Sequence, residues 1–205
     1  MSYLPQLLTL AAVLLLACIS PGPDFIAVTS HALASRRRGL GVALGVAAAC
    51  VVWASLAMFG LGVLLVRISW LYEAIRVVGA LYLIYLGAKL LLSARKSYGA
   101  LTVEAVEGDT RFAPRIGLLV GLTNPKSAAF FGSLFVTVLP VGAPLWVQGA
   151  TLAIVALVAG GWFTLVAYMF SAKRVRSLYA RVRRPIDAVM GAILVGLGVH
   201  LAASR

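Results

Sequence analysis

Long apolar blocks separated by short basic stretches recur along the whole chain of 205 residues. An α-helix needs about 20 apolar residues to cross a hydrocarbon core roughly 30 Å thick, at 1.5 Å per residue. Only 12% of the residues are charged, too few to cover the surface of a water-soluble domain. The pattern therefore predicts an all-α integral membrane protein without a soluble domain.

Six of these blocks are predicted to be transmembrane helices: residues 4–33, 40–66, 71–92, 116–139, 145–170 and 186–202. The first block contains Pro21-Gly22-Pro23 and the fourth contains Asn124-Pro125. Proline removes a backbone N–H and clashes with the preceding helical turn. We therefore expect the first and fourth helices to be broken at mid-membrane.

The chain divides into two similar halves of three predicted spans each. They cover residues 1–96 and 114–205, and the more polar stretch 97–113 reads as a cytoplasmic linker. The offset that places Pro23 on Pro125 also places Asp24 on Lys126. Because three is an odd number of spans, the halves are predicted to be inverted repeats. Paired proline breaks at matching positions of such halves are typical of a transporter's binding site.

The two charged residues beside these breaks are costly in lipid. Asp24 is the one acidic residue deep inside a predicted span, and inserting such a charge costs about 2.5–3.5 kcal/mol. Counted from the flanking arginines, Asp24 and Lys126 each lie roughly 16–18 Å into the membrane. A cost of this kind indicates a substrate or proton role. The alternative is a purely structural Asp24–Lys126 ion pair between the halves.

The breaks also expose backbone groups that can bind a zwitterion. Pro21 and Pro23 free the carbonyls of Ala17 and Ile19, and Pro125 frees that of Gly121. We expect the carbonyls of Ala17 and Ile19, with Asp24, to bind an ammonium group. Helices that restart at Pro23 and Pro125 present positive N-terminal ends, and these, with Asn124 and Lys126, are expected to bind a carboxylate. Asp24 is also the candidate for proton coupling.

Orientation follows from the basic residues between the spans. Thirteen Lys and Arg lie in the loops of one side, and three lie on the other. The positive-inside rule places the richer side in the cytoplasm, so both termini are predicted to face outward. The net charge of +12 is explained by these loops and by contact with anionic lipid, and it does not indicate nucleic-acid binding.

Three segments of the chain resemble the LysE/RhtB family of amino-acid exporters. Ser20-Pro-Gly-Pro-Asp-Phe25 is similar to the family's first-helix signature, and the stretch from Gly121 to Phe131 is similar to its Asn-Pro-Lys segment. Tyr82-Leu-Ile-Tyr-Leu-Gly-Ala-Lys89 resembles the third-span motif. The resemblance implies proton-driven efflux of amino acids or close analogues across the bacterial inner membrane, often by a homodimer. It does not identify the amino acid.

Two other classes of function remain open at this point. A metal-ion or other small-solute exporter, or a channel, would favour several carboxylates or thiolates in its path. An intramembrane enzyme needs a nucleophile–base pair or a metal cluster, and His31 and His200 are far apart in the sequence. Cys18 and Cys50 are interpreted as small buried residues. The sequence therefore predicts a transporter without cofactor or metal, and it leaves the roles of Lys89, Asp187 and Trp162 unassigned.

Overall fold

The computed structural model describes residues 3–67, 69–95, 105–138 and 143–171, together with 185–203 except 186, 190, 197 and 201. Over these residues the chain forms helices and no strand. The elements are α1 (Leu4–Ile19), α2 (Pro23–Ala34), α3 (Arg36–Arg67), α4 (Ser69–Arg95), the 3-10 turn η1 (Thr110–Phe112), α5 (Ala113–Thr123), α6 (Pro125–Val138) and α7 (Leu145–Phe170). A last apolar segment, Asp187–His200, follows them. The predicted all-α class is confirmed.

Two helices of the described part are long and apolar enough to cross a membrane: Arg36–Gly60 within α3, and α7. The α1–α2 pair adds a third span if the bent pair is taken as one crossing. Many large apolar side chains on these helices are exposed, Leu56 and Leu157 among them, as expected for surfaces that face lipid. The full set of six spans in two inverted repeats stays a prediction.

The first proline break is confirmed at the predicted residues. Helix α1 ends at Ile19, α2 begins at Pro23, and the two axes bend by 57°. Ser20 and Gly22 between them have extended backbone. Pro23 stands at the first position of α2, where a missing N–H costs nothing because no intrahelical acceptor exists for it.

The second break is confirmed as well, and it is shorter. Helix α5 ends at Thr123, Asn124 has extended backbone with φ −74° and ψ 109°, and α6 begins at Pro125. The Asn124 Oδ1 accepts a hydrogen bond from the Lys126 N–H at 2.9 Å. This is a helix cap, in which an asparagine side chain satisfies one of the free N–H groups of the first turn.

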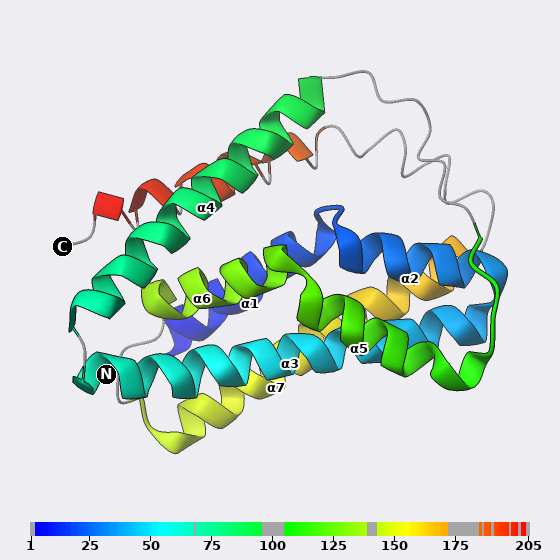
Figure 1. Ribbon diagram of the computed structural model, residues 1–205, viewed down its shortest axis with the longest axis horizontal. Helices are drawn as coiled ribbons and strands as arrows, with labels where there is room; N and C mark the ends of the chain where they lie inside the picture. Colours follow the sequence, from blue (N-terminus) through cyan, green and yellow to red (C-terminus); the bar gives the residue numbers. More distant parts are fainter. Residues whose placement is uncertain are drawn as a thin grey trace.

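Helix α3 packs against both α5 and α7. These three helices form the lower layer of the molecule in the view of Figure 1. Glycine permits the close approach of α3 and α5, because a Cβ at Gly45 would collide with the Pro114 carbonyl and one at Gly117 with the Val42 carbonyl. Small residues commonly pack membrane helices in this way. The contact fixes α5, and with it the second break, against α3.

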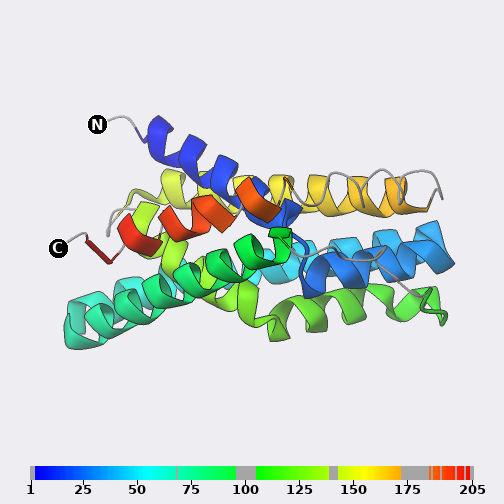
Figure 2. The same ribbon diagram turned by 90° about the horizontal axis from the view of Figure 1, so that it is seen from above.

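Helix α4 and the segment Asp187–His200 lie together along one side of this layer (Figures 1 and 2). Their contact is again made by glycine, since a Cβ at Gly87 would come within 2.6 Å of the Gly191 carbonyl. Helix α6 also packs against α4. The molecule therefore has two glycine-packed contacts, one between α3 and α5 and one between α4 and the segment Asp187–His200.

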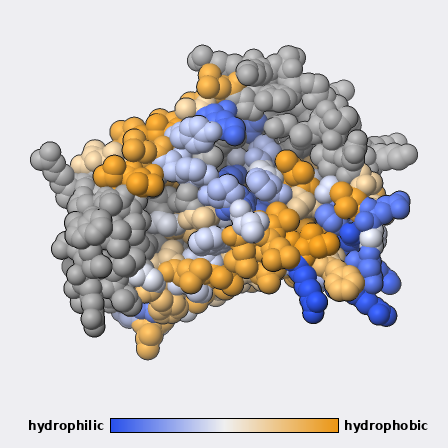
Figure 3. All heavy atoms as spheres, viewed as in Figure 1, coloured by the Kyte–Doolittle hydropathy of each residue, from blue (hydrophilic) through white to orange (hydrophobic). Residues whose placement is uncertain are grey.

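The described part of the predicted linker, residues 105–112, lies against the junction of α2 and α3. The Val106 N–H donates to the Ser30 carbonyl at 3.2 Å. Gly108, with φ +151°, covers the buried Arg38, and a Cβ there would come within 2.5 Å of both terminal guanidinium nitrogens. Strongly hydrophilic residues gather at this end of the molecule (Figure 3), where Arg36, Arg37 and Arg115 are exposed.

Candidate substrate site

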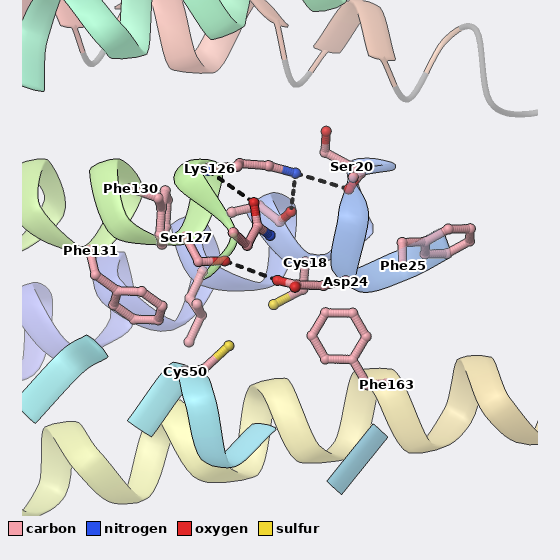
Figure 4. A pocket seen from close by; sticks show the side chains of 14 residues that line it. Cys18, Ser20, Asp24, Phe25, Cys50, Lys126, Ser127, Phe130, Phe131 and Phe163 are labelled. Carbon is pink, nitrogen blue, oxygen red and sulfur yellow. Dashed lines mark hydrogen bonds between the residues drawn. The ribbon is translucent and has the colours of Figure 1, made fainter. Parts of the chain in front are cut away.

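The two breaks meet in the middle of the molecule and enclose a cavity of about 30 Å³. At roughly 10–15 Å³ for each water, this is room for about two water molecules. Its walls come from the end of α1, the first turns of α2 and α6, and from α3 and α7. Segments far apart in the sequence therefore share one small site (Figure 4).

Lys126 reaches from the first turn of α6 to the end of α1. Its Nζ donates to the Ala17 carbonyl at 3.1 Å and to the Ser20 carbonyl at 3.0 Å. The last carbonyls of a helix have no intrahelical partner and carry partial negative charge. An ammonium group with three donors can satisfy two of them at once. The side chain therefore closes the carbonyl end of α1 at the first break.

Asp24 lies in the first turn of α2 and is 8% exposed. Its Oδ2 accepts a hydrogen bond from the Ser127 hydroxyl at 2.9 Å. No hydrogen bond joins Asp24 to Lys126, although both side chains belong to the described part and line the same cavity. The direct ion pair considered from the sequence is thus not formed in this conformation.

Three buried polar atoms in the cavity wall have no hydrogen-bond partner among the described residues. They are the Ser20 hydroxyl oxygen and the pair Asp24 Oδ1 and Asn124 Nδ2. Asn124 is 2% exposed, and its other side-chain atom is used by the α6 cap. A carboxylate oxygen is an acceptor and an amide nitrogen is a donor. Buried groups of this kind are costly unless something binds them, so the pair is suited to a ligand that offers one donor and one acceptor.

The carbonyl freed by the second proline break is bound within the protein. Trp53 of α3 donates its indole N–H to the Gly121 carbonyl at 3.1 Å, and the Asn124 N–H approaches the same oxygen at 3.4 Å. A carbonyl exposed in lipid would be costly, so a freed carbonyl must face protein or a water-filled cavity. The Trp53 indole N–H supplies the hydrogen bond that this carbonyl needs, so the Gly121 carbonyl is not free to bind a ligand.

One family of known proteins matches most of the chain. The family model for the LysE type translocator matches residues 15–205. The chain belongs to the LysE translocator family. As a LysE type translocator, the chain is a membrane transporter.

Several curated relatives of this LysE-family chain cover nearly its full length. A protein of Escherichia coli strain K12 named "Threonine efflux protein" is 35% identical over 203 residues, 97% of this chain and 98% of that protein. A "Threonine efflux protein" of Salmonella typhi is 34% identical over 202 residues, 96% of this chain and 97% of that one. A "Leucine efflux protein" of Salmonella choleraesuis is 29% identical over 197 residues, 89% of this chain and 87% of that one. No solved structure matches.

The structure brings most of the predicted site residues together, but their contacts differ from those predicted from the sequence. Asp24, Asn124 and Lys126 line the cavity, and so does Ala17. Pro23 and Pro125 start the two helices that carry the charged side chains. Ile19 ends α1, but the second carbonyl bound by Lys126 is that of Ser20.

Sequence reasoning missed every lining residue with a hydroxyl or thiol side chain: Ser20, Ser127, Cys18 and Cys50. It also missed the aromatic ring of Phe163. Ser20 is within the proline signature, and Ser127 follows Lys126 directly, so their positions next to the charged residues were the available signal. The cysteines carried no such signal, because small residues in apolar helices are common. Over the residues that the structure describes, no group of three His, Cys, Asp or Glu side chains is arranged to hold a metal ion.

Proposed function

We propose that this protein is a secondary-active exporter that moves a neutral amino acid, of the kind named for its threonine-efflux relatives, out of the bacterial cytoplasm. The observation that carries this proposal is the pair of unbonded atoms in the cavity wall, Asp24 Oδ1 and Asn124 Nδ2. An amino acid is a zwitterion whose ammonium donates and whose carboxylate accepts. It supplies both partners that the site lacks.

The ammonium group of the substrate is assigned to Asp24 and the end of α1. Asp24 Oδ1 accepts one of its hydrogen bonds, and the carbonyls of Ala17 and Ser20 accept the others. These two carbonyls now hold the Lys126 ammonium, which has the same donor chemistry as the substrate's own ammonium. Substrate entry therefore requires Lys126 to leave them.

The carboxylate of the substrate is assigned to the α6 side of the cavity. Asn124 Nδ2 donates to it, and Lys126, once displaced from α1, turns toward it. The N-terminal ends of α2 and α6 add partial positive charge at the same place. A charge in a low-dielectric site is stable only when it is paired and hydrogen-bonded. Moving one lysine from the carbonyls to the carboxylate gives the substrate's carboxylate a counter-charge, and the substrate's ammonium takes over the carbonyls.

Proton coupling is assigned to Asp24, because its carboxylate binds either a proton or the substrate's ammonium but not both. A proton entering from outside replaces the ammonium and releases the amino acid on that side. Inward proton movement then drives outward export. We place both termini on the outer side of the inner membrane, as the thirteen-to-three distribution of Lys and Arg predicts. Reporter fusions after Arg205 and within the loop 172–184 should report opposite sides, and a cytoplasmic C-terminus would contradict this orientation.

The test compares two carboxylate-to-amide changes. Asp24→Asn keeps the shape of the side chain and removes its charge, so threonine export from loaded cells should fall about 10–100-fold, the equivalent of one charged hydrogen bond of about 1.5–3 kcal/mol. Glu107→Gln makes the same chemical change on an exposed loop residue and should export at the wild-type rate. Membrane abundance of both variants is measured by immunoblot. Wild-type export by Asp24→Asn, with unchanged pH dependence, would refute the proposal.

A further inference from the structure

The side of the cavity away from Lys126 is built from thiols and an aromatic ring. Cys18 of α1, Cys50 of α3 and Phe163 of α7 lie on the opposite side of the Asp24 carboxylate from the Lys126 ammonium (Figure 4). All three side chains are buried. Helices α1, α3 and α7 therefore place uncharged side chains next to the Asp24 carboxylate, the group assigned to accept hydrogen bonds from the substrate's ammonium.

Among the residues that the structure describes, the rest of the cavity wall offers no charge for a substrate side chain. Apart from Asp24 and Lys126, which the zwitterion uses, its lining consists of apolar residues, cysteines, serines, Gly22 and Asn124. A charged substrate side chain placed here would be buried without a partner, which costs far more than burying an apolar group. The wall therefore selects against acidic and basic amino acids.

We propose that Cys18, Cys50 and Phe163 form the subsite for the substrate's side chain, and that it takes a small neutral one. This inference rests on the proposed function. The zwitterion is held at Asp24 and Asn124, and its side chain points toward α3 and α7. Cysteine is small and polarisable, so the two thiols leave room beside the Phe163 ring. Phe163 limits the length of what fits.

The size limit follows from the dimensions of the site. The cavity of about 30 Å³ holds about two waters at roughly 10–15 Å³ each, and the departure of Lys126 enlarges it on the side of the α1 carbonyls. No comparable movement is available on the thiol side, where Phe163 is 3% exposed and packed in the core. A threonine-sized side chain is accommodated there, and a leucine-sized one requires Phe163 or a cysteine to yield.

The first experiment measures selectivity. Export of threonine and of leucine is measured for the wild type, Cys50→Ala, Phe163→Ala and the matched control Phe59→Ala, whose ring is exposed on α3. Shortening Phe163 or Cys50 should raise the leucine-to-threonine ratio about tenfold, since each methylene in a hydrophobic pocket discriminates by roughly 10–200-fold. Phe59→Ala should leave the ratio unchanged. An unchanged ratio in both subsite variants would overturn the inference.

The second experiment needs no change to the pocket, because the chain has only two cysteines and both line the cavity. Methyl methanethiosulfonate forms a disulfide with a cysteine thiolate, transfers a methylthio group and releases methanesulfinate, and the thiol proton goes to solvent. Treated wild-type protein should lose export. Threonine should slow the modification, as followed by mass spectrometry, and lysine should not.

The outcomes separate the two proposals. If untreated wild-type protein in proteoliposomes exports neither threonine nor leucine, the proposed function is wrong. If it exports threonine, but the cysteines react equally fast with threonine and with lysine present, the side-chain subsite is wrong and the proposed function stands. A variant lacking both cysteines, compared with its own untreated rate, should be insensitive to the reagent. Loss of export in that variant would place the reaction elsewhere and overturn the assignment.

Discussion

The two proline breaks align at Pro23 and Pro125, and they have different structures. Between α1 and α2, residues 20–22 lie outside the helices and the axes bend by 57°. Between α5 and α6, only Asn124 does. Each break frees a carbonyl four residues before a proline. At the first, the Ala17 carbonyl is bound by the Lys126 ammonium, and at the second the Gly121 carbonyl is bound by the Trp53 indole.

The difference in bound partner indicates that the two breaks have different roles in transport. A lysine is a compact charge on a flexible four-carbon stem, so it can leave one partner for another. An indole is rigid, and Trp53 is held by the packing of α3 against the core. Helix α5 is itself fixed to α3 through Gly117 and Gly121. The second break, held by Trp53 and by the packing of α5 on α3, is therefore the fixed part of the site, which we call the frame. At the first break, the protein's own cation and the substrate's ammonium exchange.

The largest effect should come from removing the movable cation. Lys126→Met keeps the length of the stem and leaves the carbonyls of Ala17 and Ser20 without their donor. It also removes the partner assigned to the substrate's carboxylate. We expect export to fall about 100-fold or more, from the loss of at least two charged hydrogen bonds worth about 1.5–3 kcal/mol each. Proteoliposome transport measures this, with Lys89→Met as the control, because Lys89 is exposed on α4. Equal losses in both variants would remove the special role of Lys126.

The frame should fail when its closest contact is disturbed. A Cβ at Gly121 would lie 2.5 Å from the Ala49 Cβ, so Gly121→Ala forces α5 away from α3. Overpacking of this kind costs about 1–3 kcal/mol. Gly161→Ala is the matched control, because no described atom lies within 4 Å of the added methyl. Thermal unfolding of the detergent-purified variants should separate them. A Gly121→Ala protein as stable as Gly161→Ala would show that α5 is free to move.

Sequence reasoning located both breaks, because proline acts through its own backbone and needs no knowledge of the neighbours. The Asn124 cap and the freed carbonyls of Ala17 and Gly121 follow from the same local rule. The partners of those carbonyls depend on which helix lies opposite, so neither Trp53 nor the Lys126–Ser20 contact could be found locally. Opposite charges suggested an Asp24–Lys126 pair. The orphaned carbonyls at the end of α1 compete for the same ammonium, and Asp24 bonds to Ser127.

Asn124 has two roles: its Oδ1 caps α6, and its Nδ2 is assigned to the substrate's carboxylate. One substitution separates these roles. Serine also caps helices well, so Asn124→Ser keeps an acceptor for the Lys126 N–H and loses the Nδ2 donor. Stability should stay near that of the wild type. The apparent KM for threonine should rise about tenfold, which corresponds to about 1.4 kcal/mol. A lower melting temperature with an unchanged KM would mean that Asn124 serves the helix alone.

The smallest effect is expected for the indole that completes the frame. Trp53→Phe removes the donor to the Gly121 carbonyl, but the Asn124 N–H at 3.4 Å remains near that oxygen, so the cost should be about 1 kcal/mol, the usual net worth of one hydrogen bond. For a chain of this size that is a melting-temperature decrease of about 2–4 °C.

Trp162→Phe is the control, because the indole N–H of Trp162 is buried without a partner among the described residues. Its loss should be neutral or stabilising, since an unsatisfied buried donor disappears. Export should survive in both variants if the second break only frames the site. A Trp53→Phe protein that keeps its melting temperature but loses export would instead place Trp53 in the transport step, and the two breaks would then share the exchange.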